Sequence, residues 1–96
     1  MKPSHALAQH RLAIREVVQR HGMQGVRVFG SAASGEDVEG SDLDLLIEPG
    51  PATTLFTLGA LRRDLSRLLG LQVDVVTPAS LPERVRADVL ERSLRV

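Results

Sequence analysis

The 96-residue sequence contains no cysteine, tryptophan or tyrosine, and its only aromatic side chains are Phe29 and Phe56. Without cysteine the chain forms neither disulfides nor thiolate zinc sites, a composition that fits a reducing compartment. Because only two aromatic rings are present, the core must be aliphatic, and the base-stacking surface of a single-strand-binding protein is not expected.

An excess of one charge is also missing, as are long apolar runs. Twelve basic and twelve acidic side chains cancel, whereas non-specific nucleic-acid binders carry a basic excess, so direct nucleic-acid binding is not expected. No apolar run approaches the roughly 20 residues that span a bilayer, and residues 1–5 lack the apolar stretch of a signal peptide. We therefore expect a cytoplasmic protein with no membrane partner, folded as a single domain over residues 1–96.

Hydrophobic spacing predicts alternating helices and strands. Apolar residues and two histidines recur at helical spacing over 4–21, and a leucine stripe marks a second helix from Thr53 or Thr54 to Gly70. Ser80 and Glu83 match a capping box that would begin a C-terminal helix near 81, running to near 96. Three β-rich segments are predicted as strands, over 26–29, 43–48 and 72–77, with a short helical turn at 31–35.

This order predicts an α/β fold with a small mixed sheet of three strands, or slightly more, and helices packed mainly on one face. A helix joins strands 43–48 and 72–77, which favours a right-handed parallel crossover. Helices against one face satisfy the packing of the sheet and leave the other face partly open, so polar strand residues should point there.

Three aspartates lie at positions that strand alternation brings to the open face. Asp42 and Asp44 are two residues apart, so both point to the same side. If Val73 and Val75 are core residues, Asp74 points the same way. Two carboxylates about 4 Å apart repel by roughly 4 kcal/mol at an effective dielectric near 20. A retained proton or a divalent cation such as Mg²⁺ or Mn²⁺ would relieve that repulsion, although a merely solvated face is the alternative.

A glycine-serine turn precedes the aspartates. Gly30 allows the backbone to approach a ligand, and Ser31 offers an N–H and a hydroxyl at the start of a helical turn, where anions are favoured. Gly35 lets the loop turn back. Phosphates bound here could be bridged by cations to the carboxylates, a combination typical of chemistry on a nucleoside triphosphate.

Together, Gly30-Ser31, the Ser41-Asp42-x-Asp44 segment and Asp74 resemble the nucleotidyltransferase superfamily that includes DNA polymerase beta. The short length and the end of the third strand resemble the minimal nucleotidyltransferases, antitoxins paired with HEPN-domain ribonuclease toxins. The resemblance covers nearly the whole chain.

The resemblance implies that AMP is transferred from ATP to a hydroxyl of a partner protein, such as a tyrosine of a HEPN-type toxin, in a homo- or hetero-oligomer. It implies that Asp42, Asp44 and Asp74 are catalytic and hold Mg²⁺ or Mn²⁺, and that Gly30, Ser31 and Ser41 bind the nucleotide phosphates.

The sequence departs from the family pattern after the Gly-Ser pair. Many relatives carry arginines where this chain has Ala32 and Ser34. This departure keeps a second hypothesis open, an antitoxin of the same fold that neutralises its partner by binding alone. Transfer to a small molecule such as an aminoglycoside is less favoured, because those enzymes usually carry an additional substrate domain.

Overall fold

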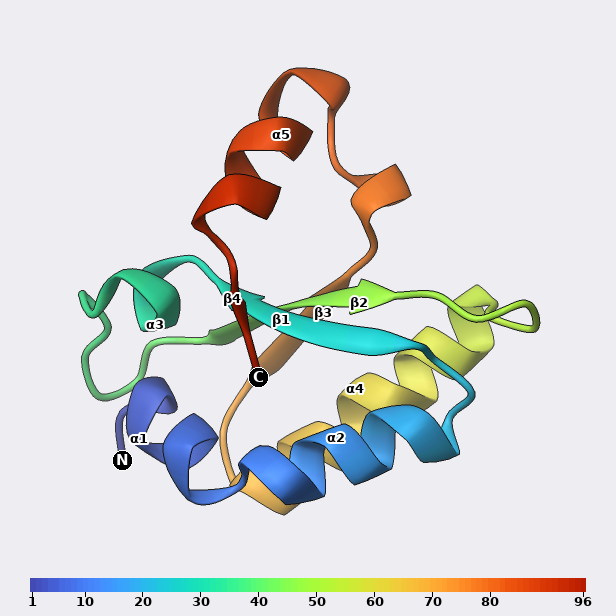
Figure 1. Cartoon of the computed structure of the whole chain (residues 1–96). Coiled ribbons are helices and arrows are strands. Elements are labelled where there is room, and N and C mark those ends of the chain that lie inside the picture. The colour runs from blue at the N-terminus through green and yellow to red at the C-terminus, as the bar shows by residue number, and fades with distance from the viewer.

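A computed structural model describes all residues from Met1 to Val96 (Figure 1). The chain folds into alternating helices and strands around a single sheet. Their bounds are α1 (Pro3–Gln9), α2 (Arg11–Arg20), β1 (Gly25–Phe29), α3 (Ser31–Ser34), β2 (Leu43–Glu48), α4 (Leu55–Leu69), β3 (Val73–Val76), the 3-10 turn η1 (Pro78–Ser80), α5 (Glu83–Arg92) and β4 (Leu94–Arg95).

The sheet is mixed and has the strand order β3-β2-β1-β4. β1 pairs antiparallel with β2 and with β4, whereas β2 pairs parallel with β3 after the crossover through α4. The expected α/β fold with a small mixed sheet is confirmed, with β4 as a short fourth strand.

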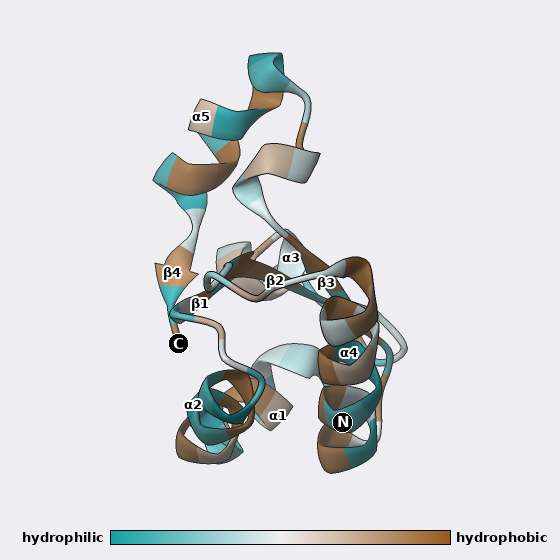
Figure 2. Ribbon diagram, turned by 90° about the vertical axis from the view of Figure 1, so that its right-hand side faces the viewer, coloured by the Kyte–Doolittle hydropathy of each residue, from teal (hydrophilic) through white to brown (hydrophobic).

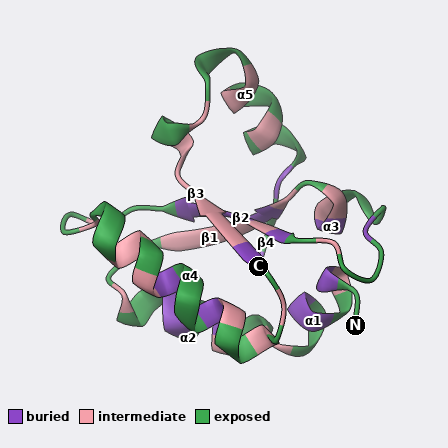
Figure 3. Cartoon of the chain, turned by 180° about the vertical axis from the view of Figure 1, so that it is seen from behind, coloured by how far each residue is buried: buried purple, intermediate pink, exposed green.

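The core lies between the sheet and the helices α2 and α4, which run beneath one face (Figure 2). Leu43, Leu45 and Ile47 alternate along β2 and are fully buried, as are Leu61 and Leu65 of α4. Such alternation is what a strand with one covered face requires. α5 rises on the opposite side and buries no residue (Figure 3), so the expectation of helices packed mainly on one face is also confirmed.

The single helix expected over 4–21 is wrong, because the chain breaks at His10 into α1 and α2. His10 has φ −121° and ψ 22°, outside the helical range. The break turns α1 toward α3, where the Ser4 N–H donates a 2.8 Å hydrogen bond to Asp37 Oδ2. Both helices contribute buried side chains, Ala6 and Leu7 from α1 and Ile14, Val17 and Val18 from α2.

The C-terminal helix is shorter than expected, and Ser80 does not cap it. Leu81 precedes Pro82, and the proline ring disfavours the helical conformation at the residue before it; Leu81 is accordingly extended, with φ −82° and ψ 141°. Ser80 instead closes η1 by exchanging hydrogen bonds with Thr77. After α5 ends at Arg92, the chain returns to the sheet as β4.

None of the helices has the length and the apolar character needed to cross a membrane.

The packing beneath the sheet predicts that Leu61→Ala will lower the free energy of unfolding by about 2–5 kcal/mol, because it leaves a cavity at a fully buried position. Urea unfolding followed by circular dichroism measures the change. Leu12→Ala is the matched control, since Leu12 is 66% exposed and should change the free energy by no more than about 0.5 kcal/mol. Equal effects at both positions would contradict the described core.

Candidate active site

Asp44 and Asp74 lie side by side on the open face of the sheet. They are direct partners in the parallel pairing of β2 with β3, and Asp44 is also the antiparallel partner of Phe29 on β1. Paired residues on adjacent strands project to the same face. Because the neighbours Leu43 and Leu45 are buried beneath the sheet, the alternation directs Asp44 to the open face, as the sequence predicts.

The environment of Asp44 is electronegative. Partial burial raises the pKa of its carboxyl group, and the negative charges of Asp74 and Asp42 raise the pKa further. No lysine or arginine lies close enough to offset these effects. Asp42 precedes β2 and is exposed, whereas Asp44 and Asp74 are half-buried.

The three carboxylates are close enough to interact electrostatically, but their oxygens do not converge on one point as metal ligands would. The structure contains no group of three or more histidine, cysteine, aspartate or glutamate side chains arranged to hold a metal ion. Mutual repulsion favours side-chain conformations that keep like charges apart. The backbone therefore brings the aspartates to one area, and their side chains would have to turn toward a shared cation.

Gly30 forms the other half of the site and lies against Asp44. Its backbone has φ 72° and ψ −151°, a conformation that only glycine adopts readily. A Cβ atom at this position would lie 2.5 Å from Asp44 Oδ2. The turn that begins α3 and the carboxylate of Asp44 are therefore in close contact, and a side chain at residue 30 would force that carboxylate to shift.

The two serines expected to contact phosphates differ in their present roles. The Ser31 hydroxyl makes no hydrogen bond within the chain, and the N–H groups of Ser31 and Ala32 have no acceptor in α3 because they belong to its first turn. Ser41 shapes the loop before β2: its Oγ accepts a 3.0 Å hydrogen bond from the Val38 N–H. Ser31 is therefore free to meet a ligand, whereas Ser41 is partly occupied by its own loop.

The positions that lack arginine provide no cationic contact. Ala32 is buried in the core, and the Ser34 hydroxyl donates a 3.2 Å hydrogen bond to the Ser31 carbonyl oxygen. Neither side chain can replace a guanidinium group.

Asp37 is a structural residue of this region that the sequence did not reveal. It is only 3% exposed, and its carboxylate accepts the hydrogen bond from the Ser4 N–H described above, which lowers the pKa of Asp37. The contact joins the start of α1 to the loop between Gly35 and Asp42. Its partner lies 33 residues away, so no local pattern in the sequence could have found it.

Comparison with known proteins identifies the family. The family described as "Nucleotidyltransferase domain" matches residues 10–96. The chain belongs to the nucleotidyltransferase family. It is an enzyme of the nucleotidyltransferase class, and the predicted resemblance is confirmed.

Two relatives show how closely the chain follows known members. It is 36% identical over 90 residues to the protein adenylyltransferase MntA of Thermococcus cleftensis, covering 94% of this chain and 88% of the relative. A solved structure described provisionally as a minimal nucleotidyltransferase is 40% identical, with a TM-score of 0.87, covering 97% of this chain and 95% of that one.

A more distant structure supports the fold alone. A crystal structure of a toxin–antitoxin with AMP-PNP is 20% identical, with a TM-score of 0.74, covering 85% of this chain and 68% of that one.

The close contact at Gly30 predicts that substitution by alanine is more destabilising at Gly30 than at Gly35, the two glycines that flank α3. Gly30→Ala should lower the free energy of unfolding by about 1–3 kcal/mol or more, because the new Cβ adds a clash with Asp44 to the strained backbone. Gly35→Ala is the control: Gly35 is left-handed, with φ 81° and ψ 10°, but its Cβ would meet open space, so only about 1–2 kcal/mol of backbone strain is expected. Chemical unfolding of both variants measures the difference, and an equal loss would disprove the contact.

The raised pKa of Asp44 predicts a pH-dependent gain in stability for Asp44→Asn. A carboxyl group whose pKa is higher in the folded than in the unfolded state favours folding while it is protonated, and this contribution is lost as pH rises through the raised pKa. Without divalent cations, the variant should therefore become more stable relative to the wild type as pH increases through and above the ordinary range of aspartate.

Urea unfolding across a pH series tests this prediction. Glu91→Gln on α5 is the control, because Glu91 is exposed and forms no ion pair. A constant difference between Asp44→Asn and the wild type at all pH values would show that the folded state does not perturb Asp44.

Proposed function

We propose that the chain transfers AMP from ATP to a hydroxyl group of a partner protein and thereby acts as an antitoxin, with a tyrosine of a HEPN-type ribonuclease toxin as the acceptor. The observation that carries the proposal is the contact between Asp44 and the Gly30 turn, with Asp74 beside Asp44 on the next strand. A candidate phosphate-binding turn thus adjoins a group of carboxylates. The likeness to an archaeal protein adenylyltransferase supports transfer to a protein.

The residues present fit a divalent cation. Asp42, Asp44 and Asp74 offer only carboxylate oxygens, the donors that Mg²⁺ and Mn²⁺ prefer. The pKa of Asp44 is raised by partial burial and by the negative charges of Asp74 and Asp42, both of which a bound cation would offset. When bound, such a cation neutralises phosphate oxygens and makes a nearby hydroxyl more acidic.

The remaining work falls to residues of the chain. The backbone of Gly30 leaves room for the triphosphate beside Asp44, and the N–H and hydroxyl groups of Ser31 are available to its outer phosphates. We assign to Asp74, half-buried on the neighbouring strand, the role of orienting the acceptor hydroxyl and accepting its proton. The acceptor oxygen then bonds to the α-phosphorus, and the bond to pyrophosphate breaks. We infer that residues 1–96 act as one domain and that the partner protein supplies the acceptor.

One observation favours a second candidate function, neutralisation of the partner by binding alone. Ala32 and Ser34 provide no cationic group to the triphosphate. Ala32 is buried in the core, and the Ser34 hydroxyl is hydrogen-bonded to the Ser31 carbonyl oxygen. Phosphate contacts would then depend on backbone groups and the bound cation, and the nucleotide could be held too weakly for efficient transfer.

A transfer assay separates the two functions. The chain is incubated with ATP labelled on its α-phosphate, Mg²⁺ and the purified product of the neighbouring gene. Label should appear on the partner, and Asp42→Asn with Asp44→Asn should reduce it at least about 100-fold, the scale expected when transition-state charge stabilisation is lost. Glu91→Gln serves as the control and should transfer normally.

The same variants are tested for suppression of toxicity in cells. If the double variant loses transfer but still neutralises its partner fully, binding alone is the function. If it retains transfer, the assigned roles of Asp42 and Asp44 are wrong.

A further inference from the structure

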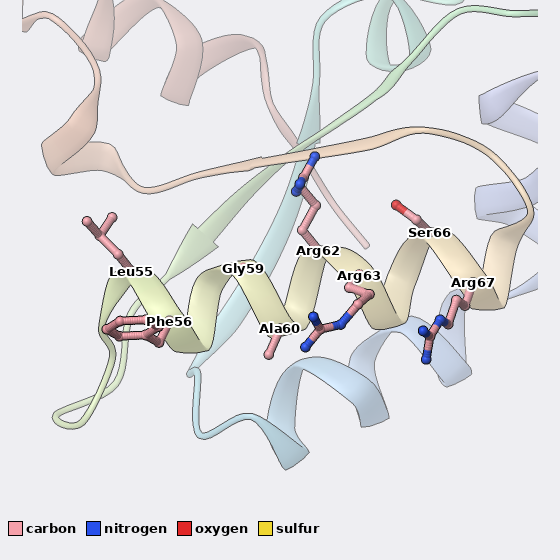
Figure 4. A pocket seen from close by; sticks show the side chains of 8 residues that line it. All are labelled: Leu55, Phe56, Gly59, Ala60, Arg62, Arg63, Ser66 and Arg67. Carbon is pink, nitrogen blue, oxygen red and sulfur yellow. The ribbon is translucent and has the colours of Figure 1, made fainter.

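An exposed surface of α4 has features that the proposed chemistry does not use, although the Arg62 side chain at its edge extends toward β3 (Figure 4). Figure 4 shows this outer α4 surface, which consists of two adjacent rows along the helix, Leu55-Gly59-Arg62-Ser66 and Phe56-Ala60-Arg63-Arg67. It lies on the opposite side of α4 from the buried Leu61 and Leu65. The surface is therefore not part of the core or of the Asp44–Asp74 area.

Its first end is apolar and almost fully exposed. Leu55 is 86% exposed and Phe56 is 90% exposed, the highest values among the large apolar side chains of the chain. Phe56 is one of only two aromatic residues. Two adjacent large apolar side chains on a helix surface are typical of a contact with another protein, where aromatic side chains contribute strongly.

The middle of the surface contains Gly59 and Ala60. A Cβ atom at Gly59 would meet nothing within 4 Å, so no contact within this chain requires glycine there. Glycine in a helix interior is unfavourable relative to alanine. The two small residues leave a shallow depression between the apolar end and the arginines, where the backbone of another helix could approach closely.

The other end of the surface has a net positive charge. Arg62, Arg63 and Arg67 form no salt bridge. The one acidic residue of α4, Asp64, forms a 2.8 Å hydrogen bond with His21, which follows α2, and its charge also attracts Arg63 and Arg67. Three arginines thus share one carboxylate, which leaves a net positive charge that attracts an acidic partner. A symmetric contact with a second copy would add three more arginines to the interface and no carboxylate other than Asp64, so it is disfavoured.

We infer that the outer α4 surface docks a helix of the acceptor protein that carries apolar side chains at one end and carboxylates at the other. The apolar side chains cover Leu55 and Phe56, the backbone approaches over Gly59, and the carboxylates pair with the arginines. This inference rests on the proposed function for the identity of the partner. Docking on α4 leaves the open face with Asp44 and Asp74 free, so holding the partner and reacting with its hydroxyl use different faces.

Binding measurements with two ligands test the inference. The chain is titrated by calorimetry with the purified product of the neighbouring gene and, separately, with ATP and Mg²⁺. Phe56→Ser and Arg63→Glu should each weaken partner binding at least about tenfold, the effect of removing a central apolar or charged contact. Both should leave ATP affinity within about twofold, because neither residue is near Asp44.

Matched controls lie on α2. Leu12→Ser replaces a leucine that is 66% exposed, and Arg20→Glu reverses an exposed arginine at the end of that helix. Both should bind the partner within about twofold of the wild type. Loss of binding in these controls as well would show a non-specific dependence on charge or solubility and would overturn the assignment to α4.

Gly59→Ala separates stability from docking. The variant should raise the unfolding midpoint of the free chain, because alanine is favoured in an exposed helix. It should also weaken partner binding, because the added methyl group prevents close approach.

Unchanged partner affinity for Phe56→Ser and Arg63→Glu would disprove the docking surface even if AMP transfer occurs. Failure of the wild type to bind the partner would overturn both the docking and the assigned partner, whereas ATP binding would still report on the nucleotide site. Dissociation of a homodimer by Phe56→Ser would assign the surface to a second copy instead.

Discussion

The pairing of β1 with β2 is the constraint on which the rest of the structure depends. From Gly25 opposite Glu48 to Phe29 opposite Asp44, this ladder determines which residues face the helices and where the turn after β1 lies. Burial of alternate side chains of β2 stabilises this register, because a slip by one residue would expose the leucines and bury the carboxylates. The same register places Gly30 directly against Asp44, so packing beneath the sheet positions the chemistry above it.

The candidate active site lowers the stability of the fold, whereas the core raises it. Three carboxylates lie near one another without a neighbouring cationic side chain, and Gly30 holds a backbone conformation that other residues reach only at a cost. Strain and like charge of this kind persist where the surrounding structure determines them and where a ligand relieves them. Although the chain has no net charge, the charges are segregated: aspartates gather on the open face and arginines line the outside of α4. The acidic open face thus suits a cation with its nucleotide, and the basic outer α4 surface suits an acidic partner.

The correct predictions and the wrong ones differ in the range of the interactions involved. The sequence predicts β2 and the ends of α4 well, because alternation, the threonine cap and the glycine stop act within a few residues. It also predicts that Asp44 and Asp74 share a face. It misses the break at His10, since α1 turns away only to pack near α3, and it misses the hydrogen bond between Ser4 and Asp37. The capping box at Ser80 fails for a local reason, the extended residue that precedes Pro82.

The sequence by itself determined the class of fold, the side of the sheet on which each aspartate lies and the presence of a glycine turn before them, because these follow from backbone geometry and from the periodic burial of aliphatic side chains. Only the tertiary structure decided that Gly30 touches Asp44, that Ser41 is engaged by its own loop, and that Leu55 and Phe56 remain outside the core. The Gly30 contact and the exposure of Leu55 and Phe56 depend on how distant segments approach one another, whereas the Ser41 contact is local but depends on a loop conformation that no repeating pattern specifies. Helical spacing alone cannot tell which apolar side chains the core has room to bury.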